Sequence, residues 1–196
     1  MAIAESKRRR RTVQEARAEI LAAASALLRE RPSDTVTVSA IMSRTTLSRK
    51  SFYVYFPDRV ALLRELLAPL RAVTDAAIAR WRTATDPRPA ARAALESAAR
   101  MYQRDGAVLR TLAEASQRDA EAAGLWREFL EPLEQAAAET ISRADARLPH
   151  ESIARALVAM NVHYLLDEVV GAEPEVLDTA VDTLAAIWER TLYPHD

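Results

Sequence analysis

The chain has 196 residues and a formal net charge of −1 at pH 7, and it contains no cysteine. Without cysteine it can form no disulfide framework, no thiolate metal site and no cysteine nucleophile, which is typical of a reducing compartment. No apolar run approaches the ~18 residues of a membrane-spanning helix, so we expect a cytoplasmic protein with no membrane partner.

The small net charge is the sum of two segments of opposite sign. Residues 1–60 contain 12 Lys and Arg against 6 Asp and Glu, and the remaining residues contain 15 against 22. A basic front segment indicates an anionic partner for that segment, although a solvated basic tail would give the same balance. Residues 7–11, KRRRR, are either an arm that attracts DNA phosphates or a disordered tail.

The spacing of the apolar residues predicts an all-α chain. Glycine is scarce, with 3 residues, and Ala, Leu, Arg and Glu recur three and four residues apart. The first helix is predicted over residues 12–30, with Thr12 as its N-cap and Glu15 completing a capping box.

Two short helices are predicted next, over residues 37–44 and 48–55, with Thr37 and Ser48 as their N-caps. Two helices joined by a short turn have the geometry of a helix-turn-helix, whose second helix enters the major groove of DNA. Arginine and lysine suit guanine N7 and O6, and hydroxyl groups suit bases or phosphates. The N-terminal end of the second helix consists of such residues: Ser48, Arg49, Lys50 and Ser51.

Four aromatic residues follow within five positions. Phe52 and Phe56 lie four residues apart, so they are predicted to share the core-facing side of the helix. Tyr53 and Tyr55 lie on other sides, where each ring can pack on the protein while its hydroxyl reaches the DNA backbone. For Tyr53, simple packing is the alternative.

A long helix is predicted to begin after its N-cap Asp58, to bend at Pro69 and to end at Asp86. The chain after it is predicted to be helical over residues 90–104, 106–117, 119–145, 150–170 and 174–192. Within these helices we expect a bend at Pro132 and a C-cap at Gly171.

These elements divide the chain into two predicted domains. Residues 1–60 form three short helices with a basic N-terminal arm, and residues 61–196 form a helical bundle. The last two predicted helices are apolar on more than one side, so each can pack both on its own domain and on a second subunit. Two such helices from each chain would form a four-helix dimer interface.

Residues 35–67, TVTVSAIMSRTTLSRKSFYVYFPDRVALLRELL, resemble the helix-turn-helix domain of the TetR family of transcriptional regulators. The resemblance implies phosphate contacts by Thr37 and Arg59. It implies base and phosphate contacts by Ser48, Arg49, Lys50 and Ser51, and DNA-backbone contacts with some base contribution by Tyr53 and Tyr55. The family usually has Ala-Gly where this chain has Thr45-Thr46. Because glycine relieves a strained turn, Thr46 leaves the exact turn geometry open, but it does not affect the assignment of the motif.

Three later patches resemble the ligand domain of the mycobacterial ethionamide-resistance repressor subgroup: GLWREFL at 124–130, ARALVAMNVHYLL at 154–166 and LAAIWERTLYP at 184–194. The resemblance implies a homodimeric repressor that binds a palindromic double-stranded DNA operator and is released by a small apolar or amphipathic effector. Asn161 would be the polar anchor of an apolar ligand channel walled by Trp126 and Trp188. The alternatives are a core amide satisfied by backbone groups and two packing rings.

No enzymatic site is predicted. His163 and Asp167 can pair on a helix, but no serine nucleophile is placed with them and the sequence has no phosphate-binding glycine loop. We therefore expect no catalytic residue, no cofactor and no metal site. The alternative function is a helical ligand-binding or interaction protein without operator binding, against which the intact Arg49, Lys50 and Arg59 argue.

Overall fold

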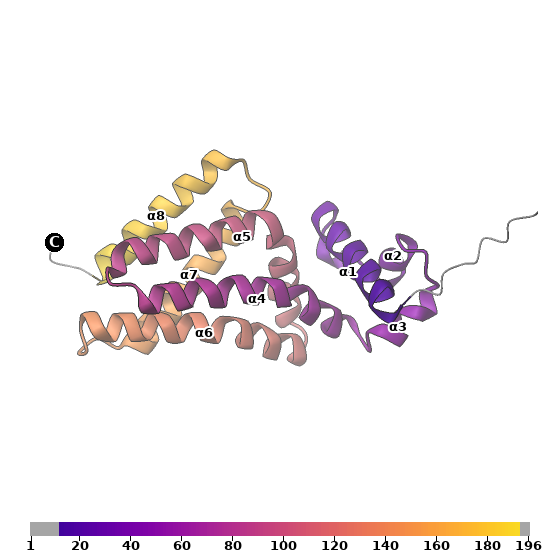
Figure 1. Cartoon of the computed structure of the whole chain (residues 1–196), viewed down its shortest axis with the longest axis horizontal. Helices are drawn as coiled ribbons and strands as arrows, with labels where there is room; N and C mark the ends of the chain where they lie inside the picture. Colours follow the sequence, from indigo (N-terminus) through magenta and orange to yellow (C-terminus); the bar gives the residue numbers. More distant parts are fainter. Residues whose placement is uncertain (1–11, 193–196) are drawn as a thin grey trace, which may run out of the picture. The chain divides into compact units, whose positions relative to one another are not determined.

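The computed structural model describes residues 12–192, and this part of the chain contains eight α-helices, two 3₁₀ turns and no strand. The predicted all-α fold is therefore confirmed. The chain forms two compact units, one ending at Leu62 and the other beginning at Leu63. Figure 1 follows the helices in chain order, from α1 in indigo to α8 in yellow.

The first unit is built from short elements. They are α1 (Val13–Glu30), η1 (Ser33–Thr35), α2 (Val38–Ser43), η2 (Arg49–Ser51), α3 (Phe52–Tyr55) and the first residues of α4 (Arg59–Thr83). Two of the caps predicted for this unit are confirmed here: Thr12 and Glu15 form a capping box, and Thr37 Oγ1 accepts from the backbone N–H of Ala40 at 3.1 Å. The core of this unit contains Ile20, Leu27, Ile41, Phe52 and Phe56, each at most 1% exposed.

The second predicted helix of the helix-turn-helix begins differently from expectation. Ser48 stands at the N-cap position, but its side chain makes no capping hydrogen bond to the backbone. Its Oγ instead lies 2.8 Å from Oγ of Ser51. The first three residues after Ser48 form the 3₁₀ turn η2, and the α-helical part, α3, starts only at Phe52.

The second unit is a bundle of long helices. After α4 come α5 (Pro87–Ser116), α6 (Ala120–Ala144), α7 (His150–Glu168) and α8 (Pro174–Leu192). α5 packs against α8 and α6 packs against α7, and α5 also contacts α6. α4 and α6 run through Pro69 and Pro132 without ending there. No helix within residues 12–192 is long and apolar enough to cross a membrane.

The predicted break between residues 104 and 106 is wrong, because the two helices expected over residues 90–104 and 106–117 are the single helix α5. A Cβ on Gly106 would lie 2.3 Å from Cγ2 of Val170, so this glycine allows a close approach rather than a turn. Gln103 and Arg110 lie on the same side of α5 and donate to the backbone carbonyls of Ala172 and Leu166. These contacts hold the end of α7 against an unbroken α5.

Two other helix ends are set by single residues. α4 ends at Thr83 rather than at Asp86, whose carboxylate instead caps α5 by accepting from the N–H of Arg88 at 3.0 Å. Gly171 follows α7 with a φ of +77°, and it is the one residue with positive φ in the described part of the chain. Glycine is favoured there because a Cβ makes this backbone conformation costly.

Candidate functional site

The outward side of η2 and α3 collects the predicted DNA-contact residues. Arg49 and Lys50 are exposed, and Tyr53 is 60% exposed. Phe52 and Phe56 are buried on the opposite side, with ring centroids 5.6 Å apart, as predicted. The short helix therefore docks through its phenylalanines and leaves its cationic and hydroxyl groups to the solvent.

Arg49 and Lys50 form no ion pair within the described part of the chain, unlike other exposed arginines nearby. Arg44, for example, is held by Glu30, with Nη2 and Oε2 2.7 Å apart. Charges that are not neutralised within the protein remain available to phosphates or base edges. This distinguishes Arg49 and Lys50 electrostatically from Arg44 in the same unit.

The end of α3 is held by Arg17 of α1, which sequence reasoning missed. Its guanidinium lies 4.8 Å from the ring centroid of Phe56, and Nη1 donates to the backbone carbonyl of Tyr55 at 2.8 Å. A cation over an aromatic face is worth about 0.5–2 kcal/mol. Tyr55 itself is half-buried, so only part of its ring faces solvent.

The turn before η2 is built without glycine. The backbone N–H of Thr46 donates to Oε1 of Glu19 in α1 at 2.6 Å, and Thr46 Oγ1 donates to Oε2 at 3.4 Å. Thr45 Oγ1 accepts from the N–H of Leu47 at 3.2 Å and donates to the carbonyl of Met42 at 2.9 Å. No non-glycine residue among 12–192 has positive φ, so Thr46 fits this turn without left-handed strain.

The two predicted phosphate contacts at the edges of this surface are both exposed. Thr37 precedes α2, and Arg59 is the first residue of α4. Nη2 of Arg59 lies 3.5 Å from the carbonyl oxygen of Ser33, at the long limit of a hydrogen bond, so little holds it in place. The basic run at residues 7–11 lies outside the described residues.

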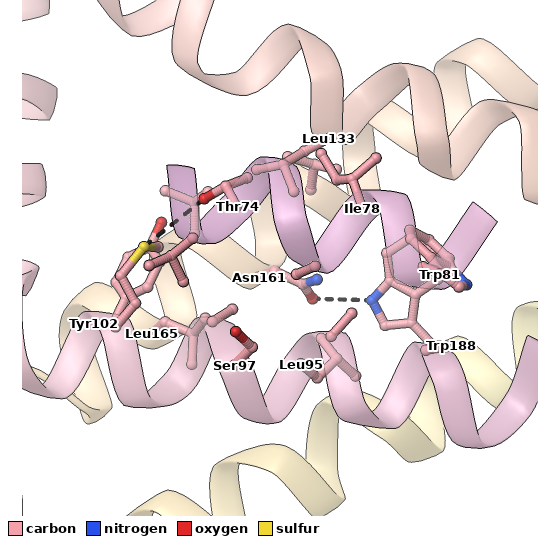
Figure 2. A pocket seen from close by; sticks show the side chains of 18 of the residues that line it. Thr74, Ile78, Trp81, Leu95, Ser97, Tyr102, Leu133, Asn161, Leu165 and Trp188 are labelled. Atoms are coloured by element: carbon pink, nitrogen blue, oxygen red, sulfur yellow. Dashed lines mark hydrogen bonds between the residues drawn. The ribbon is translucent and has the colours of Figure 1, made fainter. Parts of the chain in front are cut away.

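A cavity of about 90 Å³ lies inside the second unit (Figure 2). Its walls come from all five helices α4–α8 and are almost entirely apolar. The lining residues include Thr74 and Trp81 of α4, Met101 and Tyr102 of α5, Asn161 of α7 and Trp188 of α8.

Two hydrogen bonds join side chains of the cavity wall, and both are dashed in Figure 2. Thr74 Oγ1 donates to Sδ of Met101 at 3.8 Å, and Nε1 of Trp188 donates to Oδ1 of Asn161 at 3.2 Å. The amide nitrogen of Asn161 has no hydrogen-bond partner in the described part of the chain, so its two N–H groups are available to an acceptor. The Asn161 side chain is therefore half-satisfied: its oxygen accepts a hydrogen bond, and its nitrogen can still donate.

The tryptophan on α4 extends this wall. The rings of Trp81 and Trp188 meet edge to face, with centroids 5.6 Å apart. Nε1 of Trp81 is buried and has no partner among residues 12–192. Burial also raises the pKa of Tyr102, so its hydroxyl stays protonated at neutral pH. The polar groups of the cavity are therefore uncharged.

Trp126 does not line the cavity, in contrast to Asn161 and Trp188. Its ring stacks on Phe129, one turn along α6, with centroids 5.9 Å apart and planes 12° apart. Phe129 does line the cavity, so Trp126 supports a wall residue from behind.

Comparison with known proteins covers both units. The family described as "Bacterial regulatory proteins, tetR family" matches residues 20–66, and the one described as "Transcriptional regulator EthR, C-terminal domain" matches residues 91–194. The "HTH-type transcriptional regulator EthR" of Mycobacterium tuberculosis is 31% identical over 186 residues, covering 89% of this chain and 85% of that protein. The chain belongs to the TetR family, in its EthR-like subgroup.

Two further comparisons agree with this TetR-family membership. The EthR of Mycolicibacterium smegmatis is 27% identical, over 90% of this chain and 85% of that protein. A TetR-family regulator from Syntrophomonas wolfei has the same fold, with a TM-score of 0.72 at 15% identity, over 92% of this chain and 96% of that one. These relatives are transcriptional regulators and not enzymes, and the chain is accordingly a transcriptional regulator.

Trp81 and Tyr102 are two of the cavity residues that sequence reasoning did not assign to the site. Trp81 lies before the segment matched by the EthR C-terminal family, and outside the three patches that carry the resemblance. A signal for it did exist: Leu70, Thr74, Ile78 and Trp81 continue the apolar stripe of α4 at helical spacing, and all four are buried.

Proposed function

We propose that this TetR-family regulator is a dimeric repressor, acting in the cytoplasm, that binds a palindromic operator and is released by a small, largely apolar effector. The observation that carries the proposal is the outward side of η2 and α3. Arg49, Lys50 and Tyr53 are exposed there, while Phe52 and Phe56 anchor the helix from behind. Two copies of this surface, about 34–36 Å apart in a symmetric dimer, would enter successive major grooves of a palindrome.

Within this proposal the cations have two roles. Arg49 and Lys50 precede α3 and would contact base edges, where a good bidentate pair discriminates by about 1–3 kcal/mol. Arg59, at the start of α4, would contact phosphate and contribute equally to all sequences. Thr37, Ser48, Ser51, Tyr53 and Tyr55 would add hydroxyl contacts to the backbone around them.

The chemistry of the cavity supports an effector that is apolar and carries one hydrogen-bond acceptor. The free amide N–H groups of Asn161 can only donate, and the remaining wall is apolar. The cavity is also small: about 90 Å³ holds far less than the ~300–1,000 Å³ typical of drug-sized ligand sites. An effector must therefore be small or must widen the space between α4, α5 and α8.

Helix α4 is the element through which the effector would act. It carries Arg59 in its first turn and Trp81 near its end, so one helix bears a proposed phosphate contact and a cavity wall. Arg64 and Arg71 of α4 share Glu128 of α6, at 3.2 and 3.5 Å. These ion pairs are exposed and hence weak, so they do not lock α4 in one position.

Dimerisation is proposed to use the outer sides of α7 and α8. The apolar positions of α8 are mostly buried within the subunit, since Val181, Leu184 and Trp188 are at most 4% exposed. On α7 the exposed side carries the small residues Ala156 and Ala159, which allow a partner helix to approach closely.

A mobility-shift assay with the promoter region of the protein's own gene tests operator binding. We expect Arg49→Ala and Lys50→Ala to lower affinity for the shifted fragment and not for random DNA, and Arg59→Ala to lower both and to reduce the salt slope by about one. Arg127→Ala, which removes an exposed arginine of α6, is the matched control. Wild-type protein that prefers no promoter fragment over random DNA would favour a ligand-binding protein without operator binding.

Effector release is tested by calorimetry of an identified apolar ligand with the free protein and with the operator complex. Because linkage is reciprocal, an effector that releases DNA must bind the complex more weakly by the same factor. Equal affinity for both would contradict ligand-driven release.

A further inference from the structure

Val54 is the most exposed large hydrophobic side chain in residues 12–192, at 77%. It lies in α3, on the same short helix whose Phe52 and Phe56 are 0% and 1% exposed. A β-branched residue at an exposed helical position lowers helix propensity and buries nothing. The folding of the first unit therefore gives no reason for a valine at this position.

The neighbours of Val54 are the proposed DNA contacts. Val54 follows Lys50 by four residues and Ser51 by three, so the three side chains share the outward side of η2 and α3. Tyr53, beside it, is 60% exposed. An apolar group thus stands among cationic and hydroxyl groups, on the surface opposite the buried phenylalanines.

The major groove of DNA presents one apolar group at its base edges, the C5 methyl of thymine. We infer that Val54 is a specificity-determining residue that contacts the methyl group of one thymine in each operator half-site. The inference rests on the proposed operator binding and adds to it a contact with thymine that the cations cannot make. Lys50 and Ser51 recognise polar base edges, whereas the isopropyl group of Val54 distinguishes thymine from cytosine and from uracil by a methyl contact.

The size of the effect follows from the area involved. Moving one methyl group out of water changes affinity about fourfold, and therefore about fifteenfold when both half-sites of a dimer are changed. Truncating Val54 should lower the affinity for the natural operator by a similar factor. It should leave the affinity for an operator without these methyl groups unchanged. Alanine also raises helix propensity at this position, so a loss in Val54→Ala cannot come from a weaker helix.

The test uses the operator fragment found by mobility shift. Each thymine is replaced in turn by deoxyuridine, symmetrically in both half-sites, and the Kd is measured for wild type, Val54→Ala and Val13→Ala. Val13 is also an exposed valine of the first unit, at 64%, and so provides the same truncation away from α3. We expect one thymine position at which deoxyuridine lowers the operator affinity of wild type and of Val13→Ala about fifteenfold. At the same position the affinity of Val54→Ala should not change.

Two results would overturn the inference while leaving operator binding intact. One is a wild-type protein whose affinity is insensitive to deoxyuridine at every position. The other is that every methyl-sensitive position remains sensitive in Val54→Ala, which would assign the contacts to other side chains such as Tyr53. Wild-type protein that binds no operator at all would instead refute the proposed function, and this inference with it.

Discussion

Gly106 of α5 lies against Val170, in the turn that follows α7, and the missing side chain at this position gives a sharp test of the bundle. A Cβ on Gly106 would lie 2.3 Å from Cγ2 and 3.3 Å from Cβ of Val170. Rotating the valine moves its methyl groups but not its Cβ, so in Gly106→Ala either α5 or the turn after α7 must shift by a few tenths of an ångström. Overpacking of this kind costs about 1–3 kcal/mol.

The same substitution at Gly124 provides the control. Gly124 lies inside α6, and a Cβ there would meet nothing within 4 Å. Both alanines gain about 1 kcal/mol in helix propensity, so the difference between the two variants isolates the steric cost at Gly106. At about 2–4 °C per kcal/mol for a chain of this size, Gly124→Ala should raise Tm slightly and Gly106→Ala should lie about 2–12 °C below it.

Thermal unfolding followed by circular dichroism measures both variants, and Val170→Ala adds a second check. Removing the valine methyl groups relieves the clash, so Gly106→Ala combined with Val170→Ala should be more stable than the sum of the single effects predicts. If Gly106→Ala and Gly124→Ala unfold at the same temperature, α5 and α7 do not approach as closely as described.

Three further outcomes are expected. Glu19→Ala should weaken operator binding and lower the Tm of the first unit, because hydrogen bonds to a charged group contribute about 1.5–3 kcal/mol. Glu19→Gln keeps an acceptor for Thr46, so it should lose less affinity and less stability. Equal losses in the two variants would mean that the carboxylate does not position the turn. Ala159→Arg, on the exposed side of α7, should convert the dimer to a folded monomer, as measured by light scattering. Val181→Glu should instead unfold the chain, because Val181 is buried in its own subunit. A dimer that survives Ala159→Arg would exclude that side of α7 from the interface. Asn161→Ala should lower the free energy of unfolding, measured by chemical denaturation, by about 1–3 kcal/mol, because it leaves the indole N–H of Trp188 without its acceptor. In a Trp188→Phe background, which lacks this donor, the same substitution should cost almost nothing.

The elements that the sequence predicted well are those fixed by neighbours along the chain. The capping box of Thr12 and Glu15 and the caps at Thr37 and Asp58 each join residues three apart, and all of them are present. The burial of Phe52 and Phe56 follows from their four-residue spacing in the same way.

The errors arose where a distant contact decides the structure. Two helices were expected over residues 90–104 and 106–117, where the structure has one. The glycine inside it, Gly106, allows a close approach to Val170, which is 64 residues later in the sequence. For Thr46 the sequence left the turn geometry open, and the hydrogen bond that holds its backbone comes from Glu19 in another helix. The DNA-contact and ligand roles of the individual residues stay predictions.

The positions of the tryptophans give this protein a built-in optical reporter. The chain has 3 tryptophans, of which Trp81 and Trp188 meet in the cavity wall and Trp126 stacks on Phe129 outside it. Indole emission depends on the polarity and contacts of the ring, so any molecule that enters the cavity must change the fluorescence of the first two. In Trp126→Phe the whole tryptophan signal comes from the cavity wall, and unlabelled compounds can then be screened directly in solution.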